Sequence, residues 1–248
     1  MLALRNSAHV GRIGTYAELA TGQGCAFTAF VNVADHRDVA ATHGAMQPRL
    51  GTNPFCAAVP GPNGEPMLLD MATTKIAAGK ARVAYNKGVT VPDDCLIDDA
   101  GAPTNDPTGY IRDHTGALKA FGLHKGSGLA VMCEIMATAV AGGQAAYEPA
   151  KGGILNSMLA IVIDLAKIGD PAAVLASVGA TRAHVKSAKP IPGVSEVLTP
   201  GEPERLSAAR RFAAGIEVDE TSWSEIRAAA LSLGVTEAEF DQASRANA

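Results

Sequence analysis

Residues 123–143 read LHKGSGLAVMCEIMATAVAGG and predict the helix around which the rest of the chain is organised. Apolar residues recur here at steps of three and four, which is typical of a helix with one buried apolar face. These residues are Leu129, Met132, Ile135, Met136, Ala139 and Val140. Gly142 and Gly143 end the pattern, so the stretch predicts a core helix that starts near HKG.

The start of this helix has the residues of an anion site. His124 and Lys125 come just before the first turn, and Gly126 and Gly128 allow the backbone to approach a ligand closely. Unpaired N–H groups at a helix start favour an anion, which predicts a seat for a phosphate or carboxylate. The alternative is that Lys125 is a solvated charge and His124 caps the helix.

Composition bounds the class of protein. Of the 248 residues, 47% are hydrophobic, enough for a sizeable core. The net charge is −4, with 21 basic and 25 acidic residues spread along the chain, so nucleic acid is not an expected partner. The apolar runs are shorter than the about 18 residues of a membrane span, and no export signal is recognised. A cytoplasmic protein that does not bind membranes is therefore expected.

The cysteines lie far apart in the sequence, at Cys25, Cys56, Cys95 and Cys133. None has the CxxC or Cys/His spacing of a metal site. Three are flanked by apolar residues, as buried thiols usually are. We therefore expect reduced thiols that fill the interior.

Apolar runs predict strands at residues 1–5, 25–32, 55–60 and 67–70, and a longer run of branched residues at 158–164 predicts a central strand. VSEVL, residues 194–198, alternates as a further strand. Residues 89–120 hold many turn formers and little apolar periodicity, which predicts a long connecting loop. Internal repeats are not recognised, and a single α/β unit over residues 1–248 is expected.

Helices are predicted near residues 16–22, from Thr73 or Thr74 to Gly88, and at 171–186. A threonine would cap the second of these helices. Capping-box spacing predicts short helices near the end of the chain, at Ser222 with Glu225 and at Thr236 with Glu239.

The junction at Asp70 is suited to a ligand, because a strand, an acidic residue, threonines and a helix follow one another. The helix N–H groups can bind a phosphate, and a carboxylate at a strand end can accept ribose hydroxyls. There is no GxGxxG, so the standard Rossmann fingerprint is absent.

Polar residues suited to catalysis gather in four motifs: RNSAH (5–9), RLGTNP (49–54), LDMATT (69–74) and HKGSG (124–128). His9 follows a strand and is suited to proton transfer, although a structural role is the alternative. The sequence contains no GxSxG elbow of a hydrolase, no P-loop for phosphoryl transfer and no HExxH metal-binding motif. The residues themselves therefore predict an α/β protein with an anion site.

These motifs, in this order, resemble the malate/L-lactate dehydrogenase family of NAD(P)-dependent 2-hydroxyacid oxidoreductases. The stretches that carry the resemblance are RNSAHVGRIGTYAELA, RLGTNPF, LDMATTKIAAGKARVAYNKG, FGLHKGSGLAVMCEIMATAVAGG, ILNSMLAIVID and PGEPE. The family also contains ureidoglycolate and sulfolactate dehydrogenases, diketogulonate reductase and reductases of the cyclic imines piperideine- and pyrroline-2-carboxylate. The resemblance covers Leu2 to about Arg227.

The resemblance implies a non-Rossmann α/β fold with a mixed, largely antiparallel sheet flanked by helices, and a homodimer with its cleft near the interface. Residues 1–170 would form the sheet and cofactor-binding part, and residues 171–248 a helical part. NAD or NADP would be the cofactor, and a small 2-hydroxyacid or 2-oxoacid the substrate. The HVGRxG variant favours open-chain acids over cyclic imines.

The same resemblance implies that His9 is the catalytic acid or base, or lines the site beside the nicotinamide. It also implies that Thr52 and Asn53 lie near the substrate and the nicotinamide. The implied cofactor-binding residues are Asp70, Met71, Ala72, Thr73, His124, Lys125, Gly201 and Glu202. Hydride transfer to or from the carbon next to a carboxylate also needs a cation that holds the carboxylate, preferably an arginine.

The sequence departs from the family pattern in two places. Family members carry a longer segment before the first strand, with a further histidine and the carboxylate-binding arginine, and Arg5, Arg12 and Arg49 match no motif for that role. We therefore expect a fragment that keeps much of the cofactor site, either an active oxidoreductase or a non-catalytic dinucleotide-binding remnant. His43, in ATHGA, stands where relatives more often have proline and an aromatic residue, which predicts a different loop geometry before GTNP.

Overall fold

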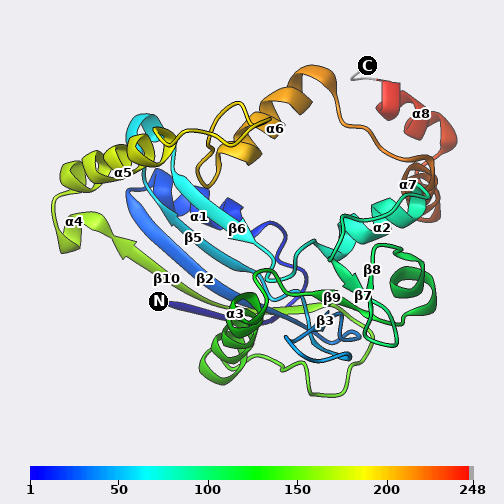
Figure 1. Ribbon diagram of the computed structural model, residues 1–248. Helices are drawn as coiled ribbons and strands as arrows, with labels where there is room; N and C mark the ends of the chain where they lie inside the picture. The colour runs from blue at the N-terminus through cyan, green and yellow to red at the C-terminus, as the bar shows by residue number, and fades with distance from the viewer. Residues whose placement is uncertain (246–248) are drawn as a thin grey trace.

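A computed structural model of the chain describes residues 1–245 and contains two five-stranded sheets with helices around them (Figure 1). Ala246, Asn247 and Ala248, the end of the expected helical part, lie outside the described residues. The first sheet has the order β1-β10-β2-β5-β6 and is antiparallel throughout. Its strands are β1 (Leu2–Ser7), β2 (Cys25–Ala34), β5 (Phe55–Val59), β6 (Met67–Met71) and β10 (Leu155–Asp164).

The two long strands of this sheet, β2 and β10, pair along their whole length, from Cys25 opposite Asp164 to Ala34 opposite Leu155. β10 lies between β1 and β2, so the predicted interior strand at 158–164 is confirmed. The strands predicted at 1–5, 25–32, 55–60 and 67–70 are confirmed as β1, β2, β5 and β6.

The second sheet has the order β4-β3-β9-β7-β8, with β3 and β9 parallel and the other pairs antiparallel. Its strands are β3 (Ala40–Ala41), β4 (Pro48–Leu50), β7 (Leu96–Ile97), β8 (Pro103–Thr104) and β9 (Ala117–Lys119). Three of them lie within residues 89–120, so the prediction of a long loop there was wrong. Strands of two or three residues are too short to show an alternating pattern, and their pairing comes from partners distant in sequence.

The described helices are α1 (Ile13–Gly22), α2 (Ala78–Asn86), α3 (His124–Ile135), α4 (Leu165–Ile168), α5 (Pro171–Lys186), α6 (Glu202–Ala214), α7 (Glu220–Ser232) and α8 (Glu237–Arg245). Short helical turns are η1 (Pro62–Gly64), η2 (Gly109–Asp113) and η3 (Met136–Val140), the last two π-helical. No helix within residues 1–245 is long and apolar enough to cross a membrane. From Pro171 onward the regular structure is helical (Figure 1).

Local capping explains which helix boundaries were predicted. α5 matches the prediction because Asp170 accepts a hydrogen bond from the N–H of Ala172 and Pro171 is its first residue. Thr236 and Glu239 form the expected capping box before α8. Ser222 does not cap α7, because Asp219 does, by accepting from the N–H of Ser222.

Two further expectations were wrong. Thr73 and Thr74 do not cap α2, which starts later, at Ala78. Their hydroxyls instead donate to the carbonyls of Thr52 and Ile76. Residues 194–198 were predicted as a strand but are irregular. An alternating pattern of apolar and polar residues is not enough to form a strand, because a strand also needs a neighbouring strand whose backbone groups are free to pair with it.

The core lies on both faces of the first sheet. The alternation of β2 turns Phe27, Ala29 and Val31 toward Ile13 and Ala17 of α1. Asn32, with the opposite orientation, meets Glu134 of α3. A second core, around Leu96 and Leu118, packs against Ala81 and Ala84 of α2.

The buried face of α3 and η3 is not the predicted one. Met132, Ile135 and Val140 of the predicted apolar stripe are exposed by 47, 43 and 57%. The buried residues are instead small or polar: Gly126, Ser127, Ala130, Cys133, Glu134 and Ala137. Small side chains share the helical period and allow the helix to approach the sheet closely, which the large apolar residues would prevent.

The cysteines agree with expectation. All four are free, and Cys56, Cys95 and Cys133 are buried. Burial raises the pKa of the Cys56 and Cys133 thiols to about 12, so both are inert thiols of the interior.

Candidate functional site

The loop that carries His9 follows β1, whose pairing with β10 has an irregular step between Leu4 and Ser7. Asn6 has a left-handed backbone, with φ of 52°, and its Oδ1 accepts from the N–H of Gln144 at 3.0 Å. Beyond it, the N–H of Val10 donates to Asn156 Oδ1 at 2.9 Å. The irregular step and these two bonds fix the path of residues 8–10 beside the start of β10.

His9 is exposed, and its Nδ1 accepts from the N–H of Gly11 at 3.0 Å. In the neutral ring this bond leaves the proton on Nε2. The ring is therefore held by one nitrogen and presents the other, as a donor, to whatever lies beside the loop.

The loop of Thr52 and Asn53 is held from both sides. Asn53 is fully buried with φ of 34°, a left-handed conformation that asparagine tolerates. Its Nδ2 donates to Glu134 Oε2 at 2.8 Å and to the carbonyl of Ala130 at 3.1 Å. The side chain of Asn53 thus serves the protein's own hydrogen bonds, and it positions its neighbour Thr52.

The segment of residues 70–73 continues β6 to this loop. Asp70 Oδ2 accepts from the N–H of Gly14, at the start of α1, at 2.7 Å, and lies 4.0 Å from Arg12 Nε. Met71 pairs with Phe55 at the end of β6, and Ala72 follows, both partly exposed. Thr73 is fully buried, and its N–H and hydroxyl both donate to the carbonyl of Thr52, at 3.0 and 2.9 Å.

The N–H groups in the first turn of α3 are hydrogen-bonded to the chain just before and at the start of the helix. Gly122 and Leu123 both have positive φ angles, of 54° and 55°. The N–H groups of Lys125, Gly126 and Ser127 donate to the carbonyls of Gly122, Phe121 and Leu123. We expected these N–H groups to be unpaired and to bind an anion, but they are paired within the protein. The groups available to a ligand at this end of α3 are therefore the exposed side chains of His124 and Lys125.

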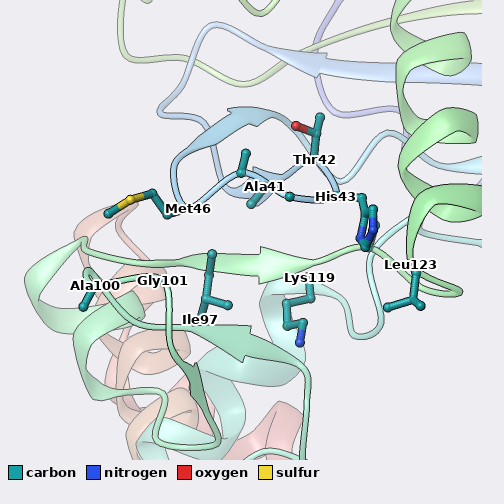
Figure 2. A pocket seen from close by; sticks show the side chains of 12 residues that line it. Ala41, Thr42, His43, Met46, Ile97, Ala100, Gly101, Lys119 and Leu123 are labelled. Carbon is teal, nitrogen blue, oxygen red and sulfur yellow. The ribbon is translucent and has the colours of Figure 1, made fainter.

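A pocket of about 350 Å³ opens between the second sheet and the start of α3 (Figure 2). Its lining includes His43, Lys119 and Leu123, with His43 and Leu123 at one end and Met46 and Ala100 at the other. The His43 ring lies 6.1 Å from the His124 ring, centre to centre, and the His43 N–H donates to Ser127 Oγ. His43, the residue that departs from the family pattern, is therefore placed beside the start of α3.

Gly201 and Glu202 lie at the other end of β6, where the N–H of Leu68 donates to the carbonyl of Pro200. Gly201 is buried with φ of 91°. Glu202 accepts from the N–H of Thr199 at 2.6 Å and pairs with Lys186 at 3.0 Å. These contacts, the Thr199 N–H first, lower the pKa of the Glu202 carboxyl to about 2.

The structure thus joins three of the four predicted motifs. The Thr52 carbonyl accepts from Thr73, and the Thr73 carbonyl accepts from the N–H of Phe121, just before HKG. His9 is linked to them indirectly, through Asn156, Asn32 and Glu134. Sequence reasoning missed Glu134, although a lone carboxylate inside an apolar helix could have indicated a buried polar network.

Two largely antiparallel sheets, flanking helices and a ligand-suited junction without a glycine-rich phosphate loop define a non-Rossmann α/β protein. The sequence profile of the malate/L-lactate dehydrogenases matches residues 1–227. The chain belongs to the malate/L-lactate dehydrogenase family, as its motifs indicated.

Individual relatives agree with this membership. Hydroxycarboxylate dehydrogenase B of Escherichia coli K12 is 41% identical over 240 residues, 95% of this chain and 66% of the relative. An L-lactate dehydrogenase of Cupriavidus necator is 36% identical over 95% of this chain and 68% of the relative. A solved E. coli structure assigned as a malate/lactate dehydrogenase superposes with a TM-score of 0.87 at 38% identity, covering 95% of this chain and 66% of that one. The predicted fold class is confirmed, and this chain spans about two thirds of its relatives' length.

Proposed function

We propose that this chain acts in an NAD(P)-dependent oxidoreductase that transfers a hydride between a nicotinamide and a small 2-hydroxyacid or 2-oxoacid such as malate or lactate. The observation that carries the proposal is the convergence of three motifs, through Thr52, Thr73 and Phe121, on the start of α3. Family membership supports the class of reaction.

The residues around this junction fit an anionic dinucleotide in part. His124 and Lys125 are exposed, and a Cβ at Gly128 would meet open space, so a ligand can approach the helix. Asp70 uses Oδ2 to hold α1, which leaves Oδ1 for a ribose hydroxyl. Thr73 is engaged within the protein, so in this proposal it shapes the site and does not touch the ligand. Glu202 is paired with Lys186 at the other end of β6, and in this proposal it anchors α6.

The bound nicotinamide would supply or accept the hydride at the carbon next to the substrate carboxylate. In the reducing direction, the carbonyl electron pair moves to oxygen as the new C–H bond forms, and the oxygen takes a proton. His9 Nε2 is the proposed donor. It would give its proton from the doubly protonated ring, so Nδ1 must first release the Gly11 N–H and take a proton from solvent, which reaches the exposed side chain. One oxoacid, one hydride and one proton give one hydroxyacid.

A second candidate function is binding of the dinucleotide without catalysis. It is favoured by the engagement of two cations that could hold a substrate carboxylate. Arg12 makes two hydrogen bonds to Glu18, both 2.9 Å long, and Arg49 bonds to Gln47 and to the carbonyl of Pro48. A clamp built from either residue would have to break these bonds first.

We also propose that the chain acts as a homodimer. The apolar side chains of Met132, Ile135 and Val140, exposed on α3 and η3, are suited to a surface that pairs with a second copy. Sedimentation velocity would give the mass in solution. A species of twice the chain mass supports the dimer, and a single monomeric species at micromolar concentration contradicts it.

The proposed function is tested by titrating the chain with NADH and with NADPH, followed by turnover with oxaloacetate, pyruvate and piperideine-2-carboxylate. Saturable binding with turnover of an open-chain acid supports the oxidoreductase, and preference for the imine would reassign the substrate class. Binding without turnover favours the second candidate, and absence of binding contradicts both. Lys125→Ala should weaken binding, whereas Lys167→Ala, an exposed lysine on α4, should not.

A further inference from the structure

Glu134 is a buried carboxylate to which only uncharged groups donate. It is 8% exposed and lies on the sheet-facing side of α3. Oε2 accepts from Asn53 Nδ2 at 2.8 Å, and Oε1 accepts from the N–H of Ala146 at 2.7 Å and from Asn32 Nδ2 at 3.3 Å. A buried carboxylate is costly unless its oxygens are bonded, so this arrangement of donors specifies an acceptor at both oxygens.

One arm of the network leads from Glu134 to Thr52. Because Glu134 takes the Nδ2 of Asn53, the Oδ1 of Asn53 is turned toward the N–H of Val33, from which it accepts at 3.2 Å. The amide orientation is thereby fixed. The adjoining Thr52 carbonyl then accepts both bonds from Thr73.

The other arm leads from Glu134 to the loop of His9. Asn32 Nδ2 points to Glu134 and to the carbonyl of Gln144, so its Oδ1 accepts from the N–H of Ser157 at 3.1 Å. The carbonyl of Asn32 accepts from Asn156 Nδ2 at 2.9 Å. Asn156 Oδ1 in turn accepts the N–H of Val10, next to His9.

We propose that Glu134 is a positioning residue that sets the His9 loop and the Thr52 loop in one relative arrangement. Both arms begin at the same carboxylate. In the first arm, Glu134 sets the orientation of the Asn53 side-chain amide. In the second arm, Glu134 holds the Asn32 side chain, and the Asn32 backbone carbonyl passes the link to Asn156. This inference rests on the proposed function only for the roles of the two loops in substrate and cofactor binding. The coupling between the loops is a property of the fold.

The test is Glu134→Gln, which keeps the shape and replaces one acceptor oxygen by a donor. The three described groups that bond to the carboxylate are all donors, so a new NH₂ in place of either oxygen faces an N–H, and at least one bond is lost. The readout is amide exchange by NMR at Val10, which reports the His9 loop, and at Thr73, which reports the Thr52 loop. Both should exchange about tenfold faster than in wild type, as loss of a buried hydrogen bond implies.

Matched variants separate coupling from general destabilisation. Asn156→Ala should release Val10 alone, and Asn53→Ala should affect Thr73 alone. Cys133→Ala, a change at a fully buried neighbour on the same helix, should alter Val10 and Thr73 no more than the paired strands β2 and β10. The ring signals of His9 should shift in Glu134→Gln and not in Cys133→Ala.

The proposal is overturned if Glu134→Gln affects only one loop, or accelerates all amides equally. If that variant does not fold, the stabilities of Asn53→Ala, Asn156→Ala and their double variant decide: coupling through Glu134 predicts non-additive losses, and additivity contradicts it. Dinucleotide titration of the same samples distinguishes this result from failure of the proposed function, because amide exchange needs neither ligand nor turnover.

Discussion

His9 is the residue on which the proposed chemistry depends, because its ring is exposed and held through one nitrogen. His9→Gln keeps a hydrogen-bonding side chain but cannot relay a proton. Turnover with a 2-oxoacid should fall by about 100-fold, the usual contribution of a positioned acid or base, while the dissociation constant for NADH stays unchanged. Steady-state rates and fluorescence titration measure the two. Equal loss of binding and turnover would show that His9 serves to hold the cofactor.

The Glu202 carboxylate provides a second test at this scale, through pH. Its folded-state pKa is lowered from 4.5 to about 2, so its stabilising contacts are complete above 4.5 and are lost as pH falls toward 2. The melting temperature of wild type should therefore fall more steeply over this window than that of Glu202→Gln. Glu204→Gln, an exposed neighbour on α6, is the control and should follow wild type. Parallel curves for wild type and Glu202→Gln would refute the role of Glu202 in anchoring α6.

At the scale of elements, the start of α3 contains two glycines with different roles. A Cβ at Gly126 would lie 2.1 Å from the carbonyl oxygen of Phe121, which is backbone and cannot give way. A Cβ at Gly128 meets open space. Gly126 is therefore required by the tight turn into the helix, and Gly128 is not required for packing.

We expect Gly126→Ala to destabilise the fold by about 1–3 kcal/mol, the usual cost of overpacking. Gly128→Ala, the matched control two residues away, should stabilise it by about 0.5–1 kcal/mol, because alanine favours a helix. Urea denaturation of both variants measures the difference. Similar stabilities would mean that the turn from Phe121 to Gly126 relaxes easily and does not define the helix start.

Element prediction from the sequence succeeded where the signal is local. Asp170 and Pro171 specify the start of α5, and the branched run at 158–164 specifies an interior strand. It failed where pairing with segments distant in sequence determines the structure. The two-residue strand β7, for example, forms only by pairing with β8 and β9. The face of α3 was also misassigned, because small residues near Cys133 and large ones near Met132 share one period, and only the sheet selects between them.

At the scale of the whole molecule, the first sheet places the candidate site at one end of its long strands. β2 contributes Asn32, the chain after β6 contributes Thr73, and β1 leads into the His9 loop. Three of the four motifs meet there, through Thr52, Thr73 and Phe121, whereas Gly201 and Glu202 lie at the other end of β6. The motifs did not specify these contacts, because Asn53 and Thr73 turn inward and the link through Glu134 is formed only by tertiary packing.

We propose that this chain transfers a hydride to the carbon next to a carboxylate. The most direct measurement uses NADH and NADPH with both hydrogens at C4 of the nicotinamide replaced by deuterium, with oxaloacetate or pyruvate as substrate and mass spectrometry of the product. Hydride transfer of this kind should give a 2-hydroxyacid with one deuterium at C2, formed by wild type and in strongly reduced amount by His9→Gln. Binding of the cofactor with no labelled product from either acid would contradict this proposal.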